Sequence, residues 1–360
     1  MVHFGFPNVI RTPEPDVPVS MIESSHVLVT GGAGFIGSAI VWALNQRGHD
    51  RILVADVLDR TEKWRNLAPL RFDDYLEADA LLGALDRGVL DQVGTILHLG
   101  ACSSTTETDA AYLMRNNTEY TKTLAEWALA RNVRFVYASS AATYGALEGD
   151  LSDRMDIAVL RPLNMYAYSK QLFDLHAQRR GYFDRIAGVK YFNIFGPNEG
   201  HKADMRSVAN KAFHEVRETG RVRLFKSHRP ECADGEQQRD FLYVKDAVEM
   251  TLHLADRPTA NGIFNIGAGR SHTWRALVAP VFEALGRPVN IEFVDMPVAL
   301  RDKYQYSTCA SLDRLREAGY QRAITPLADA VREYVSDYLL PDRRLGDEPA
   351  TPLTRSPSHS

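Results

Sequence analysis

The chain has 360 residues, of which 45% are hydrophobic and 24% are charged, values that are ordinary for a globular protein. Its 42 lysine and arginine residues against 46 aspartate and glutamate residues give a net charge of −4. This balance argues against a role in bulk nucleic-acid binding, which usually needs a basic face. The length exceeds that of one average domain and fits a large α/β unit carrying a second lobe.

The three cysteines, Cys102, Cys232 and Cys309, are far apart in the chain and form no C-x-x-C pair. This spacing predicts neither a disulfide framework nor a metal site, and reduced thiols favour a cytoplasmic location. No apolar run approaches the ~18 residues that a membrane-spanning helix needs, so we expect no membrane association.

Both ends of the chain differ in composition from the body. Residues 1–25 carry prolines where a signal peptide would have its apolar core, so we predict a flexible N-terminal extension. Residues 341–360 are rich in proline, serine and charge, which predicts a flexible tail.

The first predicted strand, residues 26–30, leads directly into a glycine-rich turn. Gly31, Gly34 and Gly37 follow the spacing G-x-x-G-x-x-G, and a helical stretch comes next. Such glycines allow a tight turn and let a pyrophosphate approach the backbone at the helix N-terminus. A turn without a ligand is the alternative for a glycine triplet alone. A second strand that ends in Asp56, an acid placed to hold a ribose, favours dinucleotide binding.

The alternation of strands and helices continues along the chain. Residues 95–101 and 133–140 are predicted strands, with a predicted helix around 108–131 between them. This pattern predicts a Rossmann-type, doubly wound parallel sheet, with a second, smaller α/β lobe elsewhere in the chain.

A candidate catalytic pair lies in the next predicted helix. Tyr166 and Lys170 are four residues apart and therefore share one helix face. An ammonium group beside a phenol stabilises the phenolate, which can then accept a proton from an alcohol. A surface Tyr–Lys pair is the alternative on spacing alone. Ser140, at the end of a predicted strand, stands where such sheets bind ligands and can donate a hydrogen bond to a substrate oxygen.

The glycine turn, the strand-end serine and Y-x-x-x-K, in this order, resemble the extended short-chain dehydrogenases/reductases. Further segments resemble the ADP-glyceromanno-heptose 6-epimerase family within that group, over about residues 27–338. The segments are GACSSTTE (100–107), YASSAATYG (137–145), PLNMYAYSK (162–170), KYFNIFGPNEGHK (190–202), DGEQQRDFLYVKD (234–246), GIFNIGAGR (262–270) and KYQ (303–305).

This resemblance implies that the protein interconverts ADP-D-glycero-β-D-manno-heptose and its L-glycero isomer, supplying heptose for the lipopolysaccharide inner core. It implies that Tyr166 accepts a proton, that Lys170 supports it, that Ser140 anchors the substrate and that Lys202 is the second acid/base. A solvated loop lysine is the alternative for Lys202.

The resemblance and the glycine turn together define two sets of binding residues. The expected cofactor contacts are Gly31, Gly34, Phe35, Ile36, Gly37, Asp56, Val57, Lys63, Leu99, Gly100, Ala101, Cys102, Ser103, Asn116, Lys170 and Ile194. The expected substrate contacts are Ser140, Asn193, Asp204, Lys211, Phe225, Lys226, Ser227, Arg239 and Tyr304.

Several of these positions have a second interpretation. Arg239 is a candidate clamp for the ADP phosphates, because guanidinium binds phosphate with two hydrogen bonds, whereas a loop ion pair with Asp240 is the alternative. Cys102 is expected to be a small filler beside the cofactor, and a nucleophile is the alternative. The sequence also departs from the family pattern, at Leu99, Val57, Asp204 and Lys211, which bears on fine contacts more than on the reaction class.

The expected domain division is a flexible extension over 1–25, a nucleotide-binding domain over 26–192 and 240–266, a substrate lobe over 193–239 and 267–340, and a tail over 341–360. Asp56 alone favours NAD, because an acid repels a 2′-phosphate. Lys63 can reach that phosphate and matches the family's lysine, so NADP is the expected cofactor and NAD the alternative. The resemblance also implies a homo-oligomer, a pentamer in the family.

Two other functions remain open at this point. Another nucleotide-sugar epimerase or dehydratase, for example one acting at C4, would share most of these motifs. A non-catalytic NADP-sensing protein on the same fold would usually lack the tyrosine or the lysine, and this chain has both.

Overall fold

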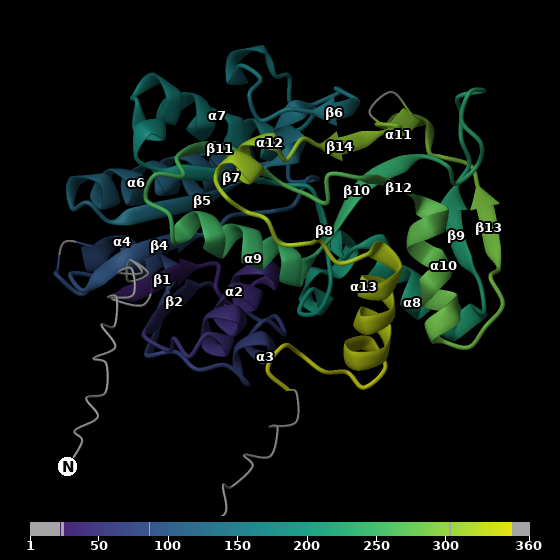
Figure 1. The fold of residues 1–360 in the computed structure, drawn as a ribbon, viewed down its shortest axis with the longest axis horizontal. Helices are drawn as coiled ribbons and strands as arrows, with labels where there is room; N and C mark the ends of the chain where they lie inside the picture. The colour runs from purple at the N-terminus through teal and green to yellow at the C-terminus, as the bar shows by residue number, and fades with distance from the viewer. Residues whose placement is uncertain (1–21, 23–24, 86, 302–303, 348–360) are drawn as a thin grey trace, which may run out of the picture.

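The computed structural model describes residue 22 and residues 25–85, 87–301 and 304–347. A seven-stranded sheet forms its centre (Figure 1), and all six strand pairings in it are parallel. Across the sheet the order is β11 (Gly262–Ile266), β7 (Ala187–Tyr191), β5 (Arg134–Ser140), β4 (Val93–His98), β1 (His26–Thr30), β2 (Ile52–Asp56) and β3 (Asp74–Glu77). The predicted Rossmann-type fold is therefore confirmed.

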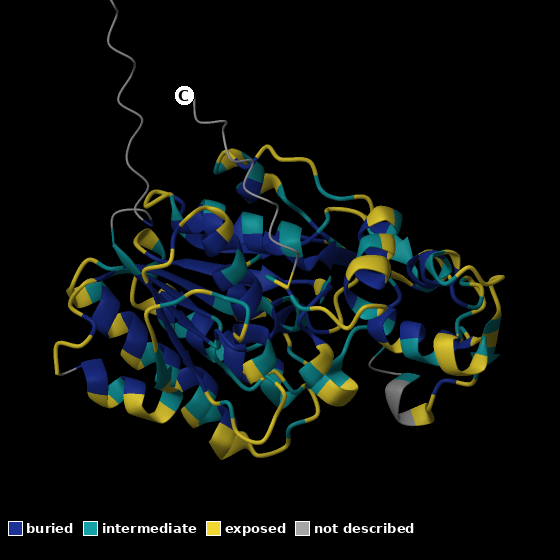
Figure 2. Ribbon diagram, turned by 90° about the horizontal axis from the view of Figure 1, so that it is seen from below, coloured by how far each residue is buried: buried dark blue, intermediate teal, exposed yellow. Residues whose placement is uncertain are grey.

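Helices cover both faces of this sheet because its strands are apolar on both sides. Val27 and Val29 of β1 pack into one core cluster, and Leu28 packs into another on the opposite face. The first cluster contains residues of α2 (Phe35–Gln46) and α9 (Val244–Ala255). The second contains residues of α4 (Ala78–Leu85), α6 (Tyr120–Ala130) and α7 (Met165–Arg179). Figure 2 shows the buried strands enclosed by helices whose outer faces are exposed.

The second lobe is built from short strands and helices beside this sheet (Figure 1). One three-stranded sheet has the order β12 (Ser271–Thr273), β10 (Gln238–Tyr243) and β8 (Asn193–Phe195). Two strand pairs are β9 (Val222–Phe225) with β13 (Ile291–Val294) and β6 (Gly149–Leu151) with β14 (Thr308–Ala310). The helices here are α8 (Val208–Thr219), α10 (Trp274–Ala284), α11 (Val298–Arg301) and α13 (Leu327–Glu333), whereas α12 (Asp313–Glu317) packs against β11 of the central sheet.

Shorter helices connect these elements. The helix predicted around 108–131 consists of α5 (Ala110–Leu113), the π-helical turn η1 (Met114–Glu119) and α6. The others are α3 (Trp64–Leu67), η2 (Ala141–Tyr144), η3 (Ile157–Val159), η4 (Tyr182–Asp184), η5 (Gly200–Met205) and η6 (Tyr334–Leu339). None of the helices in the described ranges is long and apolar enough to cross a membrane.

The described residues at the two ends of the body differ from the expected flexible extension and tail. Ile22 is only 2% exposed and belongs to the core cluster around α2. Leu345 is fully buried, and its backbone N–H donates to the Asn198 side-chain oxygen at 3.0 Å. The Arg65 guanidinium also pairs with Asp342 at 3.1 Å, so residues 341–347 contact the body through an apolar side chain, a buried hydrogen bond and an ion pair. The rest of both predicted segments lies outside the described residues.

Candidate active site

A cavity of about 700 Å³ opens at the carboxyl ends of the central strands. Its walls come from the turn after β1, the loop after β4, the end of β5, the start of α7 and the turn η5. This is the edge at which open α/β sheets bind ligands.

The glycine turn after β1 brings two backbone segments closer together than any side chain would allow. Gly31 has φ +69°, and a Cβ atom placed on it would lie 2.6 Å from the Gly100 nitrogen. A Cβ on Gly37 would lie 2.0 Å from the Gly31 carbonyl oxygen. Helix α2 follows with Gly34 at its N-cap, where no side chain caps the helix. The turn therefore presents backbone and a helix N-terminus to the cavity, which fits the pyrophosphate of a dinucleotide.

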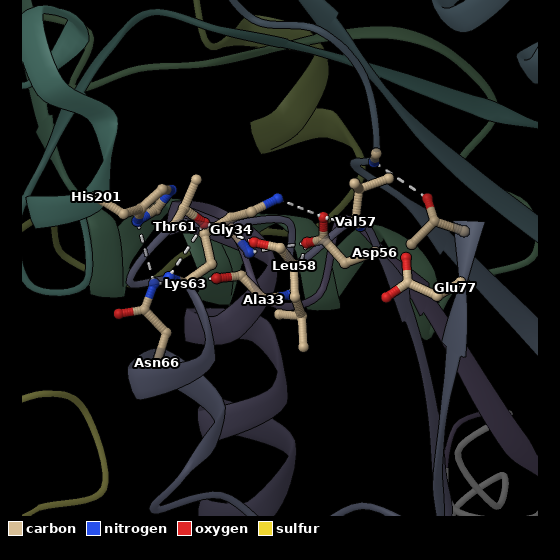
Figure 3. Close-up of polar contacts among 12 residues, drawn as sticks. Ala33, Gly34, Asp56, Val57, Leu58, Thr61, Lys63, Asn66, Glu77 and His201 are labelled. Atoms are coloured by element: carbon tan, nitrogen blue, oxygen red, sulfur yellow. Dashed lines mark hydrogen bonds and ion pairs between the residues drawn. The ribbon is translucent and has the colours of Figure 1, made fainter. Parts of the chain in front are cut away.

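The strand-end acid Asp56 is held by the turn and by a lysine (Figure 3). One carboxylate oxygen accepts hydrogen bonds from the Ala33 and Gly34 N–H groups at 2.9 and 3.1 Å. The other accepts from the Val57 N–H and from the Lys63 ammonium, both at 2.7 Å. The Lys63 ammonium therefore offsets the negative charge that would oppose a ribose phosphate.

His201 lies beside this pair and also lines the cavity (Figure 3). Burial, with the charges of Lys63 and Lys202, lowers its pKa to about 4. Its Nδ1 is 3.2 Å from the amide nitrogen of Asn66. The described residues contain no group of three or more His, Cys, Asp or Glu side chains that could hold a metal ion.

Tyr166, Lys170 and Ser140 meet in the same cavity. Burial raises the pKa of the Tyr166 phenol, whereas a hydrogen bond with the Ser140 side chain lowers it. Lys170 is 5% exposed, its ammonium donates to the Ala138 carbonyl at 2.8 Å, and burial lowers its pKa to about 8. The structure thus favours a shared site over the alternative of a surface pair.

Lys202 lines the cavity from the turn η5, a different element from the one that carries Tyr166. Its ammonium lies 5.3 Å from the centre of the Phe35 ring. Burial lowers the pKa of Lys202, and the nearby Glu199 carboxylate opposes that shift. A partly desolvated amine of this kind can donate and accept protons more readily than a solvated lysine.

Most of the predicted cofactor residues line the cavity, as do Ser140 and Asn193 from the substrate set. Val57 and Asn116 do not line it. Val57 is 45% exposed, and the Asn116 amide donates to the neighbouring Asn117 side chain at 3.3 Å.

Apart from Asn193, the predicted substrate residues of the second lobe lie outside the cavity lining. Asp204 and Lys211 are exposed, and Lys226 pairs with Asp295 at 3.2 Å. The Ser227 hydroxyl donates to the Arg229 carbonyl at 2.9 Å, and Phe225 ends β9.

Arg239 and Tyr304 form an aromatic and cationic cluster that reaches the cavity through Trp274. The Arg239 guanidinium carbon lies 4.9 Å from the centre of the Tyr304 ring and 5.8 Å from that of Trp274. The Trp274 indole donates to the Tyr304 hydroxyl at 2.8 Å, and Trp274 itself lines the cavity. The Asp240 carboxylate instead accepts bonds from three backbone N–H groups, those of Ala268, Gly269 and Ala310. This arrangement favours the clamp over the ion pair with Asp240.

Other cavity residues were not predicted from the sequence, among them Thr61, Ser139, His201, Met205, Arg206 and Trp274. Trp274 is the first residue of α10 and follows the N-cap residue Thr273. The threonine indicates in the sequence that a helix begins here, but nothing in the sequence indicates that Trp274 lines the cavity. His201 is adjacent to Lys202 and could have been found from that neighbour.

Comparison with known proteins gives the family. Residues 27–267 match the model of the NAD dependent epimerase/dehydratase family. The chain belongs to this family. A Nitratidesulfovibrio vulgaris (strain DP4) protein named ADP-L-glycero-D-manno-heptose-6-epimerase is 51% identical over 316 residues, 87% of this chain and 97% of the relative. A Fusobacterium nucleatum protein of the same name is 39% identical over 324 residues, 87% of this chain and 98% of the relative.

Solved structures agree on the fold. A Helicobacter pylori ADP-L-glycero-D-manno-heptose-6-epimerase has a TM-score of 0.75 at 23% identity, covering 89% of this chain and 98% of that one. A UDP-N-acetylglucosamine 4-epimerase from Methanobrevibacter ruminantium M1 has a TM-score of 0.76 at 22% identity, with 89% and 99% covered. The family model and the curated relatives show that the protein is an epimerase that uses a nicotinamide cofactor, and the glycine turn fits such a group.

Proposed function

We propose that this epimerase interconverts ADP-D-glycero-β-D-manno-heptose and its L-glycero isomer at C6, and so supplies heptose for the lipopolysaccharide inner core. Curated relatives of 39 and 51% identity carry the name of that enzyme. The observation that carries the proposal is that Tyr166 and Lys202 line one cavity from two different elements. An inversion by oxidation and re-reduction needs two such groups.

The geometry of inversion explains this need. A nicotinamide dinucleotide, when bound, supplies transient acceptance and return of a hydride. Because the hydride leaves one face of C6 and returns to the other, the C6 carbonyl must turn, most simply about the exocyclic C5–C6 bond. The carbonyl oxygen then points to a different part of the pocket. Proton transfer requires heavy atoms within about 3 Å, so one side chain cannot serve both positions.

The residues divide this work between the two epimers. Tyr166 exchanges the alcohol proton of one epimer, and Lys202 exchanges that of the other. The Lys170 ammonium stabilises the Tyr166 phenolate, which offsets the rise in pKa that burial causes. Ser140 donates a hydrogen bond to the substrate oxygen and orients it toward Tyr166.

Substitution of each acid/base tests this division. Tyr166→Phe and Lys202→Met should each lower the epimerisation rate by about 10² to 10⁴, the usual contribution of acid–base catalysis. Lys122→Met is the matched control, because Lys122 pairs with Glu119 on the outer surface of α6. An NMR assay of C6 configuration gives the rate. A near-normal rate for Lys202→Met would show that Lys202 is only a loop lysine.

A second experiment tests the route of the hydrogen. In heavy water the product should carry no deuterium at C6, because the hydride returns directly to the carbon it left. Substantial incorporation would indicate a carbanion route and contradict the scheme. A panel of other nucleotide sugars distinguishes the alternative substrates, and faster turnover of a C4 epimer pair would overturn the choice of heptose.

We propose NADP as the cofactor, with the substrate between the nucleotide-binding domain and the lobe of residues 193–239 and 267–340. The Lys63–Asp56 ion pair supports NADP, since the lysine offsets the acid that would otherwise repel a 2′-phosphate. The Arg239, Tyr304 and Trp274 cluster supports a place for the ADP portion, because guanidinium binds phosphate and aromatic rings stack on bases. The family resemblance supports a homo-oligomer in the cytoplasm.

Cofactor identity is measured on the purified protein. The hydride is returned in each turnover, so the protein should retain its cofactor and react with none supplied. Phosphate analysis of the released dinucleotide should give NADP. Release of NAD alone would reverse that choice, and sedimentation analysis gives the oligomeric state.

A further inference from the structure

A buried carboxylate follows the Tyr166–Lys170 pair on the same helix. Asp174 lies eight residues after Tyr166 and four after Lys170, so all three share one face of α7. Asp174 is 0% exposed. Burying a charged carboxylate is costly unless its oxygens are bonded, and the proposed mechanism assigns no proton transfer to this one.

The contacts of Asp174 reach two strands of the central sheet. Its oxygens accept hydrogen bonds from the Tyr137 hydroxyl and the Ser139 hydroxyl of β5, each at 2.7 Å. The Lys190 ammonium of β7 lies 3.4 Å away and is itself only 2% exposed. Lys190 also donates to the Thr143 hydroxyl at 2.5 Å. The carboxylate is therefore bonded twice to β5 and paired with a buried cation.

The same strand end holds the ammonium of Lys170. Ala138 stands between the two residues that bond to Asp174, and its carbonyl accepts the Lys170 hydrogen bond at 2.8 Å. Three consecutive residues of β5 are thus tied to α7 by polar bonds. Any shift of the helix along the strand would break the Asp174 bonds and the Lys170 bond together.

We propose that Asp174, together with Lys190, is a positioning residue for the Tyr166–Lys170 pair. The carboxylate fixes the end of β5 against α7 and places a negative charge behind the Lys170 ammonium. Lys190 offsets part of that charge. The inference rests on the proposed roles of Tyr166 and Lys170 and adds to them a source of their geometry and charge balance.

Charged and titratable groups from every neighbouring element contribute to this balance. The groups near Lys170 are His98 and Cys102, and those near Asp174 are Tyr137, Tyr144 and Lys190. Asp153 lies near Lys190. Burial lowers the pKa of Lys170 to about 8, and the Asp174 charge opposes that shift. Burial also lowers the pKa of Lys190, which Asp174 again opposes. Asp174 therefore helps to keep both amines protonated.

Substitution of the two partners should have opposite effects. Asp174→Asn should move the alkaline limb of the kcat–pH profile to lower pH by about one unit, because the charge that favours the Lys170 ammonium is lost. Lys190→Met should move it to higher pH, because the Asp174 charge is then less offset. The double variant should lie near the wild type. Asp184→Asn, at an exposed aspartate just beyond α7, is the matched control.

A direct titration separates this inference from the proposed function. NMR of the holoenzyme labelled at the lysine ε-carbons follows the Lys170 ammonium without any substrate, and Lys170→Arg assigns its resonance. The pH at the midpoint of the Lys170 titration should be lower in Asp174→Asn and higher in Lys190→Met than in the wild type. If the wild type does not turn over ADP-heptose but these midpoints shift, the proposed function fails and the charge coupling stands.

Four results would overturn the inference. If the Lys170 titration midpoint is unchanged in both variants, Asp174 has a merely structural role. The same conclusion follows if the midpoint shifts in the same direction in both. If Asp174→Asn does not fold, Lys190→Met decides, and an unmoved midpoint there overturns the proposal. A lower kcat with an unchanged profile in every variant would likewise count against it.

Discussion

Replacing Gly37 with alanine tests whether the glycine turn is as closely packed as the structure shows. The added Cβ would lie 2.0 Å from the Gly31 oxygen, 2.7 Å from the Gly31 carbonyl carbon and 2.9 Å from Gly32 Cα. Real Cβ atoms essentially never come within 3.0 Å of such neighbours, so the turn and the first turn of α2 must separate by about 1 Å. All three contacts are backbone atoms, and no side-chain rotation can relieve them.

The expected cost follows from this displacement. Overpacking of this kind costs about 1–3 kcal/mol in the free energy of unfolding. We expect dinucleotide affinity to fall at least about tenfold, equivalent to about 1.4 kcal/mol, because the moved backbone is the part that approaches the pyrophosphate. Gly83→Ala is the matched control, since Gly83 lies in α4 with no atom within 4 Å of its added Cβ.

The control should change stability in the opposite direction. Alanine in place of a helical glycine with free space stabilises by about 0.5–1 kcal/mol. Urea unfolding gives the stability of both variants, and the ratio of absorbance at 260 and 280 nm gives the retained dinucleotide. If Gly37→Ala is as stable as Gly83→Ala and keeps its dinucleotide, the close approach of backbone at this turn is refuted.

Two further predictions concern pH. Burial lowers the pKa of His98 to about 3, so this histidine stabilises the fold fully above pH 6.5, and that contribution is lost as the pH falls toward 3. Between pH 7 and 5 the wild type should therefore lose about 2 kcal/mol more than His98→Gln in urea unfolding, whereas parallel curves would contradict the burial of a neutral imidazole. The Lys170 pKa of about 8 predicts that kcat falls as the pH rises through 8, by about tenfold per unit well above it. A flat profile from pH 7 to 10 would show that the ammonium form is not required.

The parts of the fold that could be predicted are those that a short stretch of neighbouring residues is sufficient to indicate. The strand predicted over 26–30 matches β1 (His26–Thr30), and β5 begins within one residue of the strand predicted over 133–140. Tyr166 and Lys170 both lie in a helix, α7, as predicted. Buried strands have continuous apolar runs and the glycine turn has a fixed spacing, so neighbouring residues are sufficient to indicate them. Helix α2 begins at Phe35, inside the glycine turn, where we expected the glycines to precede the helix.

The parts that were not predictable depend on contacts between distant residues. Strands β6, β8, β12 and β14 have three residues each, too few to show a period of two. Strand β6 pairs with β14, more than 150 residues later. The bonds from Tyr137 and Ser139 to Asp174 likewise become evident only when β5 and α7 are packed together. The sequence placed Tyr166 and Lys170 correctly on one helix face but could not indicate what lies behind them.

The proposed mechanism imposes a further condition on the turn that carries Lys202. In that mechanism the C6 carbonyl turns while the hydride donor stays in place. Lys202, the proposed second acid/base, must therefore keep a constant position relative to the glycine turn. Asn66 meets this condition, because its amide nitrogen lies 3.0 Å from the Ala33 carbonyl oxygen, 3.1 Å from that of Asn198 and 3.2 Å from the His201 ring (Figure 3). One buried side chain thus joins the glycine turn to the residue next to Lys202.

A second contact joins the same two turns independently. The Asn198 amide donates to the Ser38 hydroxyl of α2 at 2.9 Å, while its side-chain oxygen accepts the N–H of Leu345. The turn before Lys202 is therefore bonded to the first helix after the glycine turn and to the packed end of the chain. Because these bonds are buried, breaking them would leave polar groups without partners, which is costly. The two turns are consequently joined by several buried bonds, as the proposed rotation of the substrate between Tyr166 and Lys202 requires.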